Sequence, residues 1–211
     1  MRKRKGSLKR YCKEHTSLPG RALQDLERKT HLTTLAPQMI SGHIQGRFLS
    51  MISHLLRPKN VLEIGTFTGY SAICLAEGLA SDGRVHTIEV NPEYATMSLH
   101  AAQDAGFQDK IVFYLGDALE LIPKLEIDFD LVFIDAAKMS YQDYFELIFT
   151  KVIKGGFILM DNLLWGGKVI TDANDAETNA LRTFAHQIQN DARLENILLP
   201  IRDGLMICRK V

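Results

Sequence analysis

Cysteine is scarce in this 211-residue chain, and its three residues (Cys12, Cys74 and Cys208) are odd in number and far apart. This spacing argues against a disulfide framework and against a zinc site, and it predicts reduced thiols in a cytoplasmic protein. No stretch approaches the roughly 18 apolar residues of a membrane helix. No apolar segment follows the N-terminus as it would in a secretory signal peptide. We therefore expect a cytoplasmic protein with no membrane partner.

An excess of charge of one sign is also lacking, because 25 Lys and Arg residues balance 25 Asp and Glu residues. Such a chain carries no global field that would favour nucleic acid or a membrane surface. The exception is local, since seven of the first thirteen residues are basic. We predict a solvated, mobile arm over residues 1–16, while a contact of this arm with RNA stays open as an alternative.

The next segment, residues 17–57, predicts a helical cap before the first strand. Leucines recur there at helical intervals, namely Leu23, Leu26, Leu32 and Leu35. A second helix is expected over 40–56, with one apolar face made of Ile44, Phe48, Leu49, Ile52 and Leu55. These amphipathic helices could be buried against a twin subunit, so we expect a homodimer.

Residues 58–211 predict an α/β core in which apolar strands alternate with helices. The expected strands are 61–65, 84–89, 111–115, 130–135 and 156–161, followed by a terminal pair at 195–200 and 204–209. The expected helices are 70–80, 92–105, a short one near 118–124, 141–152 and about 177–190. Asp203-Gly204 is a hairpin signal, so the last two strands should be antiparallel. The chain is thus predicted to be one domain.

The most informative segment is 61–72, in which an apolar strand ends at a glycine-interrupted turn that leads into a helix. Such a turn lays a ligand across the carboxyl edge of an open sheet. Its glycines do not follow the dinucleotide spacing, and the chain has no phosphate-binding loop motif. Glu63 suits a ligand with amine or sulfonium charge, and Glu89 lies where a carboxylate typically binds ribose hydroxyls. Together these features indicate S-adenosylmethionine.

Oxygen-bearing side chains end two later strands of the predicted sheet. Asp135 ends the fourth strand, and Asp161 with Asn162 ends the fifth. Carboxylate and amide oxygens without nearby Cys or His suit Mg²⁺, Mn²⁺ or Ca²⁺ rather than zinc. The sequence therefore predicts a divalent metal site beside the cofactor turn.

Lys138 lies three residues after Asp135, in the loop that leaves this edge. A nearby divalent cation disfavours a charged ammonium, and a neutral amine could take a proton from a hydroxyl group. The alternative is a surface lysine that pairs with Asp143 or Glu146.

Two further residues each allow two interpretations. Asp117 could bind adenine or cap a helix, and Trp165 could line a substrate site or pack in the core.

Taken together, these residues resemble the cation-dependent class I O-methyltransferases, the caffeoyl-CoA and catechol O-methyltransferase family with its bacterial relatives. The resemblance covers most of the chain, and its most specific segments are 39–47, 63–71, 161–162 and 200–204. It implies a Rossmann-like sheet of seven strands in the order 3-2-1-4-5-7-6, with strand 7 antiparallel. It also implies methyl transfer from S-adenosylmethionine to one hydroxyl of a catechol-type phenolic small molecule.

The resemblance implies specific roles for residues of this chain. The expected cofactor contacts are Met39, Ser41, Glu63, Gly65, Thr66, Ser71, Glu89, Asp117, Ala118 and Asp135. The expected metal ligands are Asp135, Asp161 and Asn162, with Lys138 as the general base. Many relatives have an acid or a bulky aromatic residue where this chain has Ala137, a departure that bears on acceptor choice.

Two other functions stay open at this point. Bacterial relatives include tRNA hydroxyuridine methyltransferases, and the basic N-terminus is the one feature that favours this alternative. A nucleoside-binding module without catalysis would be expected to have a damaged metal set, whereas Asp135, Asp161, Asn162 and Lys138 are all present. A nicotinamide-dependent dehydrogenase is disfavoured by the glycine spacing.

Overall fold

A seven-stranded sheet with strand order β3-β2-β1-β4-β5-β7-β6 organises residues 7–211, the part of the chain that the computed structural model describes. The strands are β1 (Asn60–Ile64), β2 (Arg84–Glu89), β3 (Ile111–Leu115), β4 (Phe129–Ile134), β5 (Val152–Met160), β6 (Leu194–Leu199) and β7 (Leu205–Lys210). The first five strands are parallel, and β7 is antiparallel to both β5 and β6. The predicted fold class and strand order are confirmed.

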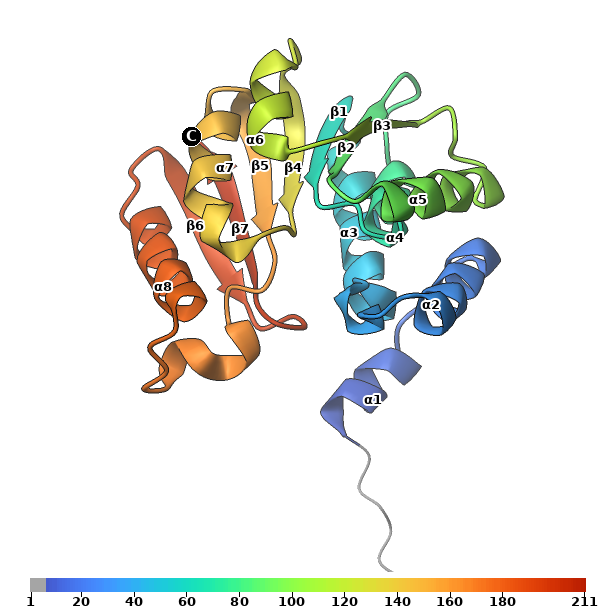
Figure 1. The fold of residues 1–211 in the computed structure, drawn as a ribbon. Helices are drawn as coiled ribbons and strands as arrows, with labels where there is room; N and C mark the ends of the chain where they lie inside the picture. The colour runs from blue at the N-terminus through green and yellow to red at the C-terminus, as the bar shows by residue number, and fades with distance from the viewer. Residues whose placement is uncertain (1–6) are drawn as a thin grey trace, which may run out of the picture.

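Helices cover both faces of this sheet. They are α1 (Leu8–Glu14), α2 (Arg21–Thr33), α3 (Gly42–Leu56), α4 (Tyr70–Ala76), α5 (Pro92–Asp104), α6 (Ala118–Leu121), α7 (Tyr141–Phe149) and α8 (Ala176–Gln189). Short 3₁₀ turns are η1 (Pro37–Met39), η2 (Ile122–Lys124), η3 (Lys138–Ser140) and η4 (Trp165–Ile170). Figure 1 shows α2 to α5 grouped on one side of the molecule and α6 to α8 on the other.

Two apolar clusters form the core, one on each face of the sheet. The first packs α7 and α8 against the sheet through Tyr141, Phe145 and Phe184. The second packs the cap and α4 against the opposite face, for example through Leu49 and Tyr70. Because the central strands are buried on both faces, they consist almost wholly of apolar residues. This burial fixes the strand ends that carry the polar residues of the site.

The buried face of α3 differs from the predicted apolar stripe. Small and polar residues such as Gly46 and Ser53 face the core, whereas Leu55 is 78% exposed. A Cβ atom on Gly46 would lie 2.5 Å from the ring of Tyr70. Ser53 donates a 2.6 Å hydrogen bond to the carbonyl of Leu75 on α4. The predicted stripe is correct for Leu49, which is buried, and for Phe48 and Ile52, which pack against the core. It is wrong for Leu55, and small residues instead fill the close approach of α3 to α4.

The first part of the cap also differs from the sequence-based expectation. Leu32 and Leu35, expected on a helical face, are 74% and 102% exposed. Helix α2 ends at Thr33, before the second of these leucines.

Part of the expected basic arm is helical. Residues 8–14 form α1, and its basic side chains are exposed, while residues 1–6 of the arm lie outside the described part of the chain. Within residues 7–211, the structure contains no helix with the length and apolarity needed to cross a membrane.

Candidate active site

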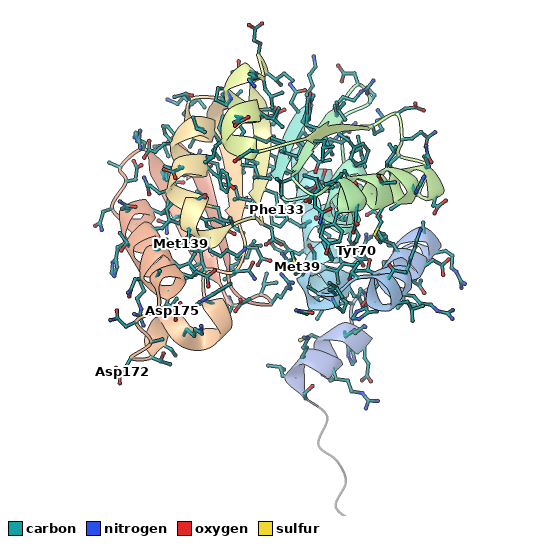
Figure 2. All side chains as sticks on the ribbon, viewed as in Figure 1. Met39, Tyr70, Phe133, Met139, Asp172 and Asp175 are labelled. Atoms are coloured by element: carbon teal, nitrogen blue, oxygen red, sulfur yellow. The ribbon has the colours of Figure 1, made fainter. Side chains whose placement is uncertain are left out.

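A cavity of about 1020 Å³ opens at the carboxyl edge of the parallel strands, beneath η1 of the cap. Its lining contains most of the residues expected at the site: Met39, Ser41, Gly65, Thr66, Ser71, Glu89, Asp117, Ala118, Asp135, Lys138 and Asn162. Figure 2 shows Met39 near the middle of the molecule, between the N-terminal helices and the half that carries α7 and α8. Residues far apart in the sequence are thus brought to one cavity.

The cofactor turn after β1 depends on glycine at position 65. Gly65 has a φ of 96°, and a Cβ atom there would lie 2.2 Å from the carbonyl oxygen of Asp135. Its N–H donates a 3.0 Å hydrogen bond to the carbonyl of Ile88. The turn is therefore packed directly onto the end of β4, which places the expected cofactor and metal residues side by side.

Glu89 at the end of β2 is held rigidly by the backbone. One carboxylate oxygen accepts a 2.7 Å hydrogen bond from the N–H of Phe67, and the other accepts a 2.9 Å bond from the N–H of Asn91. The residue is 8% exposed and lines the cavity. Each oxygen keeps a free lone pair, so a fixed carboxylate is available for a diol such as ribose.

Glu63 lies behind the turn, outside the cavity lining. Its side chain is fully buried and accepts a 2.5 Å hydrogen bond from the hydroxyl of Thr87. Burial raises the pKa of Glu63 from 4.5 to about 8. The structure thus places Glu63 as a support of the turn, and its expected direct contact with the cofactor stays a prediction.

Asp135 and Asp161 end the adjacent strands β4 and β5, as expected. Asp161 is fully buried, and its Oδ1 accepts a 2.8 Å hydrogen bond from the N–H of Asn162. Burial raises the pKa of Asp161, the neighbouring Asp135 carboxylate raises it further, and Arg202 opposes both effects. A buried carboxylate next to a second one is stabilised by a cation beside it, as Arg202 shows here.

The donor set at this edge fits a hard divalent cation. Among residues 7–211 no three His, Cys, Asp or Glu side chains come together as a metal-binding group. A site here would therefore combine the two carboxylates of Asp135 and Asp161 with the side-chain amide of Asn162, which lines the cavity. All three supply oxygen, the ligand that Mg²⁺, Mn²⁺ and Ca²⁺ prefer.

Lys138 points into the site rather than toward Asp143 or Glu146. Its Nζ donates to Oδ1 of Asp135 at 3.0 Å and to the hydroxyl of Tyr141 at 2.9 Å. Its side chain is 10% exposed. The geometry favours the expected active-site position over the surface alternative.

Tyr141 and Arg202 belong to this cluster and were not predicted from the sequence. The ring of Tyr141 is buried, and its hydroxyl donates a 2.9 Å hydrogen bond to the carbonyl of Asp161. Burial raises the pKa of Tyr141 well above its usual value, so the hydroxyl keeps its proton. The spacing of Tyr141, three residues after Lys138, is the signal that could have indicated this contact.

The structure also bears on the two interpretations of Asp117 and of Trp165. Asp117 caps α6 through a 2.8 Å hydrogen bond from the N–H of Leu119, and it also lines the cavity. Trp165 and Ala137 line the cavity too, and Nε1 of Trp165 is buried without a hydrogen-bond partner among the described atoms. Nε2 of His43, a residue outside the cavity lining, donates a 2.7 Å hydrogen bond to the carbonyl of Ser17, which agrees with a structural role.

This sheet topology and this site define a class I methyltransferase. A model of the O-methyltransferase family matches residues 13–211. The chain is 34% identical to a caffeoyl-CoA O-methyltransferase of Populus kitakamiensis, over 97% of this chain and 94% of that protein. It is 32% identical to caffeoyl-CoA O-methyltransferase 1 of Eucalyptus globulus, over 93% and 85%.

Solved structures agree with these relatives. An SAH-bound methyltransferase of Podospora anserina superposes with a TM-score of 0.89 at 28% identity, over 97% of this chain and 94% of that chain. An O-methyltransferase from Bacillus cereus, in complex with SAH, gives a TM-score of 0.88 at 28% identity, over 96% of each chain. The chain therefore belongs to the O-methyltransferase family, and the predicted enzyme class is confirmed.

Proposed function

We propose that this O-methyltransferase transfers a methyl group from S-adenosylmethionine to one hydroxyl of a vicinal dihydroxy-aromatic small molecule, with a divalent cation bound at the end of β4 and β5. The observation that carries the proposal is the packing of the cofactor turn, which follows β1, onto the acidic edge. By acidic edge we mean the ends of β4 and β5, which carry Asp135 and Asp161. Because Gly65 packs closely against the backbone of Asp135, a donor bound at the turn and an acceptor bound at the end of β4 would share one cavity. The SAH-bound relatives support the choice of donor.

Side chains of the cavity are placed to bind different parts of S-adenosylmethionine. The fixed carboxylate of Glu89 would accept hydrogen bonds from the ribose hydroxyls. Asp117 and Ala118 would surround the adenine, and Met39 with Ser41 would cover the cofactor from the cap. Their common place in the cavity lining supports these roles.

Asp135, Asp161 and Asn162 would hold the divalent cation. When bound, such a cation supplies Lewis acidity, which favours the oxyanion of a chelating diol. A catechol would suit such a site better than a simple phenol, because its two neighbouring oxygens could both bind the cation. Trp165 and Tyr144 line the cavity and would provide apolar walls for a planar ring.

Lys138 would accept the proton of the reacting hydroxyl. Its Nζ is held by Asp135 and Tyr141 at the edge where the acceptor would bind. The oxygen then attacks the methyl carbon, the carbon–sulfur bond breaks, and S-adenosylhomocysteine leaves. Alignment of oxygen, methyl and sulfur in such a cavity can contribute roughly 7–11 kcal/mol.

Methylation assays with catechol, caffeate and caffeoyl-CoA test the proposal, each with and without a chelator. We expect methylation of at least one of these diols, loss of activity with EDTA, and recovery on addition of Mg²⁺. Full activity after exhaustive EDTA treatment would contradict the metal site. A hydroxylated tRNA substrate in the same panel would reveal an RNA acceptor if it alone were methylated.

A further inference from the structure

Arg202 inserts a permanent cation into the acidic edge. One guanidinium nitrogen, Nη1, lies 2.5 Å from Oδ2 of Asp161 and 4.0 Å from Oδ2 of Asp135. These are the two carboxylates of the proposed metal site. The arginine therefore binds to the same acidic groups that a divalent ion would use.

The other guanidinium nitrogen of Arg202 binds the cap. Nη2 donates to three backbone carbonyls, at 2.8 Å from Gln38 and at 3.2 Å from both Met39 and Ile40. These residues lie in and beside η1, which covers the cavity. One side chain thus connects the acidic edge to the segment that is expected to cover the cofactor.

The backbone at this position is unusual for an arginine. Arg202 has a φ of 52°, in the left-handed region that favours glycine. It lies in the turn between β6 and β7, which is held to the chain after Asn162 by hydrogen bonds from Leu163 and Leu164. The turn therefore delivers the guanidinium to a defined place, and such strained residues cluster at functional sites.

The position of Arg202 affects the net charge that a divalent cation would meet at the acidic edge. Asp135 and Asp161 are the acidic groups of this edge, and the guanidinium of Arg202 already lies against both of them. A divalent ion adds two further positive charges to a mostly buried cluster, where repulsion is poorly screened. An arginine cannot lose its proton to relieve this repulsion.

We infer that Arg202 competes with the divalent cation for Asp161 and releases residues 38–40 of the cap when the cation binds. Arg202 is then a positioning residue that weakens metal affinity and links metal binding to the cover of the cofactor. The inference rests on the proposed metal site. It goes beyond that site by assigning a competing group and a coupled segment.

Binding of Mn²⁺ to the purified full-length protein, followed by electron paramagnetic resonance of the free ion, tests the competition. Arg202→Gln should bind Mn²⁺ at least about tenfold more tightly than the wild type, and Arg202→Lys should stay near the wild-type affinity. Arg182→Gln is the matched control, because Arg182 also binds backbone carbonyls, including those of Ala173 and Thr171, but forms no ion pair with any residue of 7–211. Its affinity for Mn²⁺ should not change.

Hydrogen–deuterium exchange tests the link to the cap. In the wild type, saturating Mn²⁺ should raise exchange several-fold at the amides of Met39 and Ile40. In Arg202→Gln, exchange there should be high already and insensitive to Mn²⁺. A merely structural arginine would lower the melting temperature without increasing metal affinity.

Several results would overturn the inference. Equal or weaker Mn²⁺ binding by Arg202→Gln, with measurable binding by the wild type, removes the competition and leaves the metal site intact. Absence of Mn²⁺ binding in both forms removes the metal site as well. If Arg202→Gln does not fold, hydrogen–deuterium exchange of the wild type still tests the inference, because unchanged exchange at residues 38–40 on Mn²⁺ binding contradicts the coupling.

Discussion

Lys138 donates a 2.9 Å hydrogen bond to the hydroxyl of Tyr141. The same hydroxyl donates to the carbonyl of Asp161, so it fixes the amine relative to the end of β5. Because the tyrosine keeps its proton, it is an anchor rather than a second base. The position of the proposed base is therefore set by a group that need not contact the acceptor.

Tyr141→Phe tests this anchoring. We expect turnover to fall by about tenfold, because an amine that has lost one of its two partners samples more positions. Loss of a buried hydrogen bond should also lower the free energy of unfolding by about 1–2 kcal/mol. Steady-state kinetics and calorimetric binding of S-adenosylmethionine measure the effects. Cofactor affinity should be unchanged, and a matching loss of affinity would contradict a role confined to Lys138.

Lys138→Ala tests the base itself. Turnover should fall by roughly 10²–10⁴-fold, since proton transfer by a positioned group contributes this much. Cofactor affinity should change far less. Lys154 on β5 is exposed and is the matched control, so Lys154→Ala should keep full turnover. Near-normal turnover of Lys138→Ala would remove the assignment.

Gly65→Ala tests the close contact between the cofactor turn and β4. A methyl group there would collide with the carbonyl of Asp135 at a positive φ, so we expect a loss of about 3 kcal/mol or more in the free energy of unfolding. Gly106→Ala is the control, since Gly106 also has a positive φ but open space around it. Its loss should be about 1 kcal/mol, from backbone strain alone. Chemical denaturation compares the two, and equal losses would show that the contact adds nothing.

The positions of the strands and the acidic edge could be predicted because both follow from local patterns, whereas the strand order was implied only by the resemblance to the family. Apolar runs mark strands buried on both faces, and the acids that end them mark the carboxyl edge. Asp135 and Asp161 come together because β4 and β5 are neighbours in register. These features need no knowledge of distant contacts.

The cap and the position of Arg202 in the site depend on long-range packing. The buried face of α3 is chosen by its close approach to α4, which small residues such as Gly46 permit and a hydrophobic pattern does not reveal. Arg202 reaches Asp161 across 41 positions of sequence. The hairpin motif around it indicated a turn, but not where the turn would deliver the side chain.

The buried carboxyl group of Glu63 should make the stability of the folded protein depend on pH. Its pKa is about 8 in the folded protein and 4.5 as an ordinary carboxyl, so the folded state holds a proton that the unfolded state releases between these values. Stability is therefore full below about pH 4.5, falls as the pH rises toward 8, and levels off above it. The loss is on the order of 5 kcal/mol at most, given about 1.4 kcal/mol for each pKa unit.

Glu63→Gln tests this dependence, because an amide has nearly the shape of the protonated acid but does not titrate. Between pH 5.5 and 8.5 the wild type should lose more stability than the variant, as measured by thermal unfolding at each pH. Glu120 on α6 is exposed and serves as the control, so Glu120→Gln should follow the wild type. Parallel pH profiles for the wild type and Glu63→Gln would show that Glu63 is ionised in the folded protein.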